Sequence, residues 1–167
     1  ILREFSPLIT AIMVAGRTGS AYTAELGIMK INQELDALNT LGVTAAELLL
    51  LPRIIGLVIV LPLLTMWSNI FGLFGGMVMA NNMLGITTID FLSRFPSVVP
   101  LKTLVLGLCK TPIFALLIGT VGCFEGINVR DNAGSVGEKT TRSVVLSIFL
   151  IILADALFSI LFSKMKL

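Results

Sequence analysis

The chain has 167 residues, of which 56% are hydrophobic and only 13% are charged. Soluble domains are about 25% charged, so this composition is typical of a membrane protein and argues against a soluble enzyme or a disordered chain. The net charge of +2 is too small to indicate a nucleic-acid partner. The chain has no histidine, which excludes Ser-His-Asp catalysis, Cys-His catalysis and His-ligated zinc. Its two cysteines, Cys109 and Cys123, are too few for a thiolate metal site, so we expect no bound metal.

Four apolar segments are long enough to cross a membrane, because a spanning helix needs about 20 mostly apolar residues. They cover residues 5–29, 54–80, 98–124 and 143–163. The strands of a membrane β-barrel would alternate over about ten residues, and these long apolar runs do not. The chain is therefore predicted to be an all-α membrane protein. We expect a polytopic helical bundle with four spans in one domain over residues 1–167, joined by connections at 30–53, 81–97 and 125–142.

Small residues recur at helical spacing in three places. They are the pairs Gly16 and Ser20, Gly72 and Gly76, and Gly122 and Gly126. Such pairs let helix backbones approach closely, so we expect tight packing, within one chain or between two copies. The alternative is that glycine is simply frequent in membrane helices.

The connection between the first two segments has the pattern of a short amphipathic helix over residues 31–41. Ile31, Leu35, Leu38 and Gly42 fall on one helix face. Glu34 and Asp36 point elsewhere, together with Asn39. A helix lying on lipid would favour Lys and Arg on its polar face, whereas this face is acidic. The pattern therefore favours docking to a protein partner over contact with lipid.

Two charged residues lie deep in apolar segments, where each costs about 2.5–3.5 kcal/mol on insertion scales. Lys110 lies in the third segment and Asp155 in the fourth. If the outer ends of these helices are level, the two residues differ in depth by about 6 Å and are within reach of an ion pair. Three alternatives remain: a structural ion pair, a polar lining for a lipid headgroup or a conformational switch, and a proton relay.

The first segment contains two further charges, Arg17 and Glu25, about two turns apart on one helix face. They are expected either to make hydrogen bonds between helices or to link a cavity to the amphipathic helix, with the first favoured. A second group of charges lies before the fourth segment and is expected to form a solvated turn. It consists of Arg130, Asp131, Glu138, Lys139 and Arg142.

Several blocks of the sequence resemble the MlaE (YrbE) family, the permease subunits of lipid-transporting ABC systems. The resemblance extends over essentially the whole chain, and its two most specific blocks are a glycine-arginine block and a Glu-Leu-Asp-Ala-Leu block. The first runs from Ala15 to Ala21 and includes Gly16, Arg17, Gly19 and Ser20. The second is Gln33, Glu34, Leu35, Asp36, Ala37 and Leu38. Further matches are Ala24-Glu25-Leu26-Gly27, Pro52-Arg53, the stretch around Arg142, and the segment around Asp155.

The resemblance implies a fold of five spans with an N-terminal interfacial helix, of which this chain would contain spans two to five. It implies that residues 31–41 form a cytoplasmic coupling helix that docks on an ATPase, and that Arg3 and Glu4 lie near a lipid-binding cavity. Lys and Arg are equally divided between the two sides, so charge counting alone gives no orientation. The implied setting is the bacterial inner membrane.

The implied function is the movement of phospholipid between that membrane and a periplasmic carrier, which maintains the lipid asymmetry of the outer membrane. The implied partners are a second permease copy, a cytoplasmic ABC ATPase, a hexameric MCE-domain protein and a STAS-domain protein. The segment from Gly134 to Thr140 resembles a phosphate-binding loop, but Glu138 separates its glycine from its lysine. ATP and magnesium would therefore bind the partner and not this chain.

Two other functions are weighed against this one. An ion-coupled secondary transporter would use Lys110 and Asp155, but the inverted repeats that would support it are not evident. An intramembrane enzyme without histidine would need a paired-acid or Ser–Lys site. Among the last three segments only Asp155 supplies a well-buried acid, so a pair lacks its second member.

Overall fold

The computed structural model describes residues 3–42, 44, 46–98, 101–130 and 132–164, and the regular secondary structure in this part of the chain is helical. The elements, in chain order, are α1 (Phe5–Val14), the π-helical turn η1 (Ala15–Gly19), α2 (Ser20–Ile31), α3 (Glu34–Thr40), the π-helical turn η2 (Ala46–Leu50), α4 (Leu51–Leu84), α5 (Thr88–Val98), α6 (Leu101–Ile127) and α7 (Ala133–Lys164). The predicted all-α fold is confirmed.

Three helical stretches in the described part of the chain have the length and hydropathy of membrane spans. They are Leu48–Leu84, Lys102–Ile127 and Ala133–Lys164. The first predicted segment is also helical, but η1 divides it into pieces of 10, 5 and 12 residues. Neither α-helical piece reaches the length of a span on its own. The chain is a multi-pass membrane protein.

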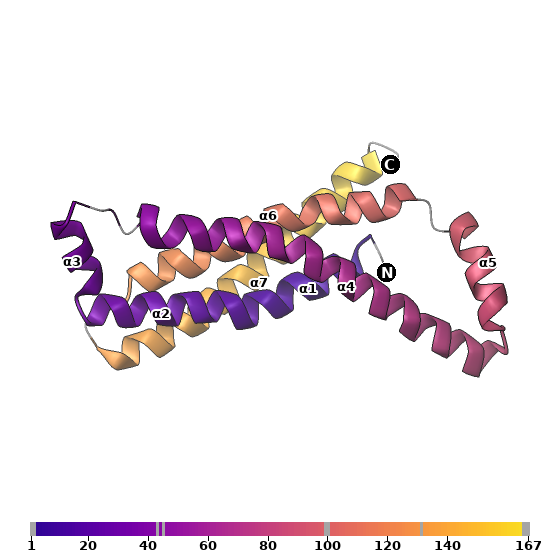
Figure 1. The fold of residues 1–167 in the computed structure, drawn as a ribbon, viewed down its shortest axis with the longest axis horizontal. Coiled ribbons are helices and arrows are strands. Elements are labelled where there is room, and N and C mark those ends of the chain that lie inside the picture. The colour runs from indigo at the N-terminus through magenta and orange to yellow at the C-terminus, as the bar shows by residue number, and fades with distance from the viewer. Residues whose placement is uncertain (1–2, 43, 45, 99–100, 131, 165–167) are drawn as a thin grey trace.

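The long helices run side by side, with α3 at one end of the bundle and α5 at the other (Figure 1). Helix α6 packs against α2, α4 and α7 and so lies at the centre of the contacts. The core between them contains Ala15, Leu61, Phe114, Ile118 and Ile151, all fully buried. Many large apolar side chains on the outside are exposed, as expected for helices that face hydrocarbon rather than water.

Two predicted connections are largely helical, and the sequence-based boundaries are wrong there. Residues 81–97 contain α5, an amphipathic helix with Asp90 in its first turn, which was missed because its apolar run is too short for a span. Helix α7 begins at Ala133 and not near residue 143. The Asn132 side chain accepts a 2.8 Å hydrogen bond from the backbone N–H of Ser135 and caps the first turn. Polar residues therefore extend the helix beyond its apolar part.

Candidate functional site

A group of four charged residues lies inside the bundle around Lys110, whose side chain is fully buried. The Lys110 ammonium lies 2.6 Å from Oε2 of Glu4, just before α1, and 3.0 Å from Oδ1 of Asp155 in α7. Nε of Arg3 lies 3.3 Å from Oε1 of the same Glu4. We call Arg3, Glu4, Lys110 and Asp155 the Lys110 cluster. It has two positive and two negative charges and is neutral as a whole.

Aromatic contacts complete the surroundings of the two cations. The Lys110 nitrogen lies 5.6 Å from the centre of the Phe162 ring, and Cζ of Arg3 lies 5.4 Å from it. Both distances are within the range of cation–π attraction. The cluster is closed on the Lys110 side and partly open on the other, because the Arg3 and Glu4 side chains are 28% and 35% exposed. A ligand would therefore meet Arg3 and Glu4 first.

The helix that carries Lys110 is adapted to the proline two residues later. Pro112 lies inside α6 and has no N–H to donate to the carbonyl of Leu108, one turn earlier. The Thr111 hydroxyl donates a 2.9 Å hydrogen bond to this carbonyl instead. The helix thus continues through Pro112 and holds Lys110 between α1 and α7.

The structure brings together the two intramembrane charges that the sequence paired and adds a third. Lys110 and Asp155 are in direct contact, at the level that helix rise predicted. The family resemblance places Glu4 near a lipid-binding cavity, and the structure shows that Glu4 is the second partner of Lys110, a contact that residue spacing alone does not predict. Lys110 therefore has two carboxylate partners. Among the described residues, no three His, Cys, Asp or Glu side chains come close enough to hold a metal ion.

Glu25 and Arg17, which share a face in the sequence pattern, have different surroundings. Oε2 of Glu25 lies 2.8 Å from Nη2 of Arg53, which joins α2 to α4. The Arg53 guanidinium also lies 5.5 Å from the centre of the Tyr22 ring. Arg17 is exposed in η1 and forms no ion pair with any residue that the structure describes. The expected bonding between helices is thus present at Glu25 and not at Arg17.

A second charged group lies where α6 ends and α7 begins. The Glu125 carboxylate is 3% exposed and lies 3.0 Å from Nζ of Lys139 and 3.4 Å from Nε of Arg142. We call these three residues the Glu125 cluster. The predicted turn is wrong for Lys139 and Arg142, because α7 is already helical here and brings both side chains to Glu125 of α6. Lys139 is only 19% exposed, whereas Arg142 is 61% exposed and is solvated as expected. Asp131, placed in the same turn, lies outside the described residues.

The predicted amphipathic helix is present but shorter than residues 31–41. Ile31 still belongs to α2, and Gln33 adopts a left-handed conformation with φ of 60°, so the chain turns before α3 begins at Glu34. The exposed side chains of Glu34 and Asp36 face outward, with Asp36 3.4 Å from Lys30. Leu35 is buried and anchors the helix, whereas Ala37 is exposed and Leu38 half-buried.

Close glycine packing occurs between α2 and α6. A Cβ placed on Gly122 would lie 3.0 Å from the carbonyl oxygen of Gly19, and one on Gly126 would lie 2.7 Å from Cβ of Leu26. The tight contact expected of Gly122 and Gly126 is therefore present. The η1 turn changes the register in the first segment, so Gly19 is buried while Gly16 is exposed and Ser20 half-buried.

The other predicted glycine pair, Gly72 and Gly76, lies in α4 and is only half-buried at both positions. A Cβ on Gly76 would meet no described atom within 4 Å. Gly76 therefore does not pack closely against another part of the described chain. Of the two predicted kinds of contact, only packing between two copies remains possible at this position.

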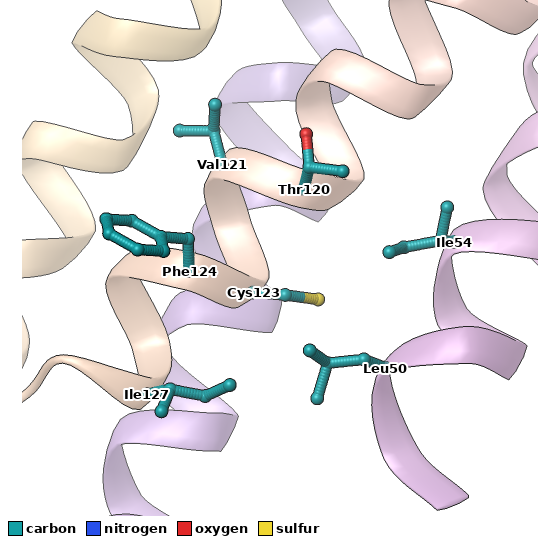
Figure 2. A pocket seen from close by; sticks show the side chains of 7 residues that line it. All are labelled: Leu50, Ile54, Thr120, Val121, Cys123, Phe124 and Ile127. Carbon is teal, nitrogen blue, oxygen red and sulfur yellow. The ribbon is translucent and has the colours of Figure 1, made fainter. Parts of the chain in front are cut away.

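Two hollows lie at the end of the bundle that carries α3. An apolar groove of about 440 Å³ runs between the start of α4 and the end of α6. Figure 2 shows the Cys123 side chain pointing across this groove toward Leu50 and Ile54. A charged pocket of about 430 Å³ lies between α6 and α7, beside the Glu125 cluster. Phe124 lines both hollows.

Comparison with known proteins identifies the family. The family model described as Permease MlaE matches residues 1–161. The chain belongs to the MlaE permease family. It is 35% identical over 155 residues to a probable ABC transporter permease protein of Synechocystis sp., which covers 93% of this chain and 59% of that protein. It is 32% identical over 165 residues to a probable ABC transporter permease protein of Rickettsia bellii, covering 98% of this chain and 63% of that protein.

A chloroplast protein is also similar to this MlaE-family chain. Protein TRIGALACTOSYLDIACYLGLYCEROL 1, chloroplastic, of Arabidopsis thaliana is 34% identical over 160 residues, which is 96% of the chain and 46% of that protein. The chain thus spans between 46% and 63% of the length of these relatives. The part matched by the MlaE family model includes the Lys110 cluster, α3 and the Glu125 cluster.

Proposed function

We propose that this chain is the membrane core of a permease subunit in an ABC transporter that moves phospholipids. Membership of the MlaE permease family and the names of the bacterial relatives support the permease role. The name of the Arabidopsis relative includes the name of a diacylglycerol lipid, which favours a lipid as the substrate. The apolar bundle with charges inside it suits a molecule that has both apolar chains and a polar headgroup.

The observation that carries the proposal is the partly open, neutral Lys110 cluster within an apolar bundle. A phosphate group that approaches from the Arg3 side competes with Glu4 for the cations, since both are anionic oxygen acceptors. When phosphate takes the place of Glu4, Lys110 keeps Asp155 as a partner, and the displaced Glu4 loses its contact with the cations. Binding of a headgroup therefore loosens the tie between α1 and α6, which makes the cluster suited to couple lipid occupancy to helix movement.

The chain itself performs no bond chemistry in this proposal. A cytoplasmic ABC ATPase binds ATP and magnesium and docks on α3 through Glu34 and Asp36. A second permease copy forms a homodimer with this one. A periplasmic MCE-domain hexamer, together with a STAS-domain protein, completes the assembly in the bacterial inner membrane, where the exchanged phospholipid maintains outer-membrane asymmetry.

A reconstituted transfer assay tests this function. The full-length protein, with its ATPase and MCE-domain partners, is placed in vesicles that contain a fluorescent phospholipid, and transfer is measured with and without ATP. We expect ATP-dependent transfer that falls about tenfold in Glu4→Gln and in Lys110→Gln, with Lys164→Gln as the exposed control. Transfer driven by a proton or sodium gradient without ATP would overturn the proposal and favour an ion-coupled transporter. Unchanged transfer in a folded Glu4→Gln variant would show that the Lys110 cluster is not part of the lipid path.

A further inference from the structure

The apolar groove and the charged pocket are neighbours that share one residue. Leu50 and Ile54 form one side of the groove, and Thr120, Cys123 and Ile127 form the other. Phe124, 65% exposed, lies on the ridge of α6 between the groove and the pocket. Figure 2 shows its ring directed away from Leu50 and Ile54, whereas Cys123 points toward them. One continuous surface thus changes from apolar to charged across a single aromatic side chain.

The accessible charge of the pocket is positive. Glu125 is almost fully buried and already paired with Lys139 and Arg142. Arg142 is nevertheless 61% exposed, and its guanidinium has five N–H donors, most of which remain available. Arg130 is exposed and also lines the pocket, and among the described lining residues the exposed acid is Glu138. The rim therefore complements an anionic group.

The pocket lies at the ends of two helices that are long and apolar enough to cross a membrane. It is formed where α6 ends at Ile127 and α7 begins at Ala133, while the groove extends along α6 toward the middle of the bundle. Basic pockets between membrane helices are known to bind lipid headgroups.

We propose that the groove and pocket together form a binding site for one phospholipid, with its phosphate on Arg142 and Arg130 and an acyl chain beside Cys123. This site lies at the C-terminal end of α6, away from the Lys110 cluster in the middle of that helix, and goes beyond the transport path. The bound lipid fills the space between α4 and α6 and adds an anion to the Glu125 cluster. It thereby fixes α4, α6 and α7 to one another close to α3.

Photolabelling of the full-length protein in nanodiscs tests this site. The probe is phosphatidylglycerol with a photoreactive diazirine in its acyl chain, and the matched probe is a diacylglycerol with the same chain but no phosphate. We expect phosphatidylglycerol to label the peptide of residues 120–127 about fivefold more than diacylglycerol. Thr120→Trp fills the groove and should abolish most of this label. Val105→Trp, an exposed position on the same helix, should not.

The headgroup contact is tested separately with Arg142→Gln. This variant should reduce phosphatidylglycerol labelling to the level of diacylglycerol, whereas Lys102→Gln, exposed at the other end of α6, should leave it unchanged. Equal labelling by the two probes would overturn the proposal, and so would competition by inorganic phosphate, which would assign the pocket to a free anion. Loss of the label when the ATPase is bound would show the pocket to be a protein contact. Labelling requires no transport, so its failure would leave the proposed function intact.

Discussion

Glu4 and Lys110, 106 residues apart in the chain, are joined by an ion pair of 2.6 Å. The same ammonium holds Asp155, so one cation connects the start of α1, the middle of α6 and α7. A buried ammonium in an apolar bundle is stable only with such partners. Because Lys110 has two carboxylate partners, the more exposed Glu4 can leave while Asp155 stays in contact. A structural ion pair with a single carboxylate would not allow this.

Replacing Lys110 should therefore destabilise the bundle more than replacing a carboxylate. Lys110→Met removes the cation that pairs with Asp155 and leaves Glu4 with Arg3 alone, and we expect a loss of about 3 kcal/mol in the free energy of unfolding. Glu4→Gln should cost about 1 kcal/mol or less, because Glu4 is partly exposed and Asp155 still pairs with Lys110. Thermal unfolding of the purified proteins in detergent measures both, with Lys102→Met as the exposed control on the same helix. Equal stability of Lys110→Met and the control would contradict the pairing.

The glycine contact between α2 and α6 predicts a steric effect. Gly126→Ala brings a methyl group within 2.7 Å of Cβ of Leu26, and overpacking of this kind typically costs about 1–3 kcal/mol. Gly76→Ala meets no described atom within 4 Å, so the isolated protein should lose no stability. A lower Tm for Gly126→Ala alone is the expected result. A Tm loss of similar size in Gly76→Ala would indicate that this position packs against another copy.

Helix geometry explains which parts of this arrangement the sequence predicts. A fixed rise per residue places Lys110 and Asp155 at similar depth, so spacing predicts that they are within reach of each other if their helices are neighbours. The same regularity fails at η1, because a π-helical turn has more residues per turn and rotates Gly19 into the interface in place of Gly16. Sequence spacing cannot reveal such a turn, nor can it assign a depth to Glu4 before the helix that carries it begins.

The charged groups at the ends of helices were the hardest to predict. Residues around Lys139 look solvated because they are polar, but α7 starts early and brings them onto α6. Glu125 is buried because its side chain in α6 faces Lys139 and Arg142 in α7. Sequence periodicity does not specify which faces of two helices meet. The α5 helix was missed for a related reason, since hydropathy detects spans and not short amphipathic helices.

The Glu125 cluster predicts a position-specific loss of stability. Glu125→Gln removes the buried negative charge that Lys139 and Arg142 share and leaves the partly buried Lys139 ammonium without a counter-charge, so we expect a loss of about 2 kcal/mol. Glu138→Gln, at an exposed acid in α7, should change stability by about 0.5 kcal/mol or less. Thermal unfolding of the two variants makes the comparison. If the two variants have the same Tm, the ion pairs of Glu125 do not stabilise the contact between α6 and α7.

The acidic surface of α3 predicts how an ATPase would be retained. Glu34→Lys combined with Asp36→Lys reverses the exposed charge of this helix without altering the buried Leu35, and like charges across an interface cost several kcal/mol. We expect the double variant to retain about tenfold less ATPase when the full-length protein is purified. Asp90→Lys, an acid in the first turn of α5 at the other end of the bundle, is the matched control and should retain the ATPase normally. Normal retention and normal lipid transfer in the double variant would show that α3 is not the coupling helix, because an acidic contact cannot survive reversal of both charges.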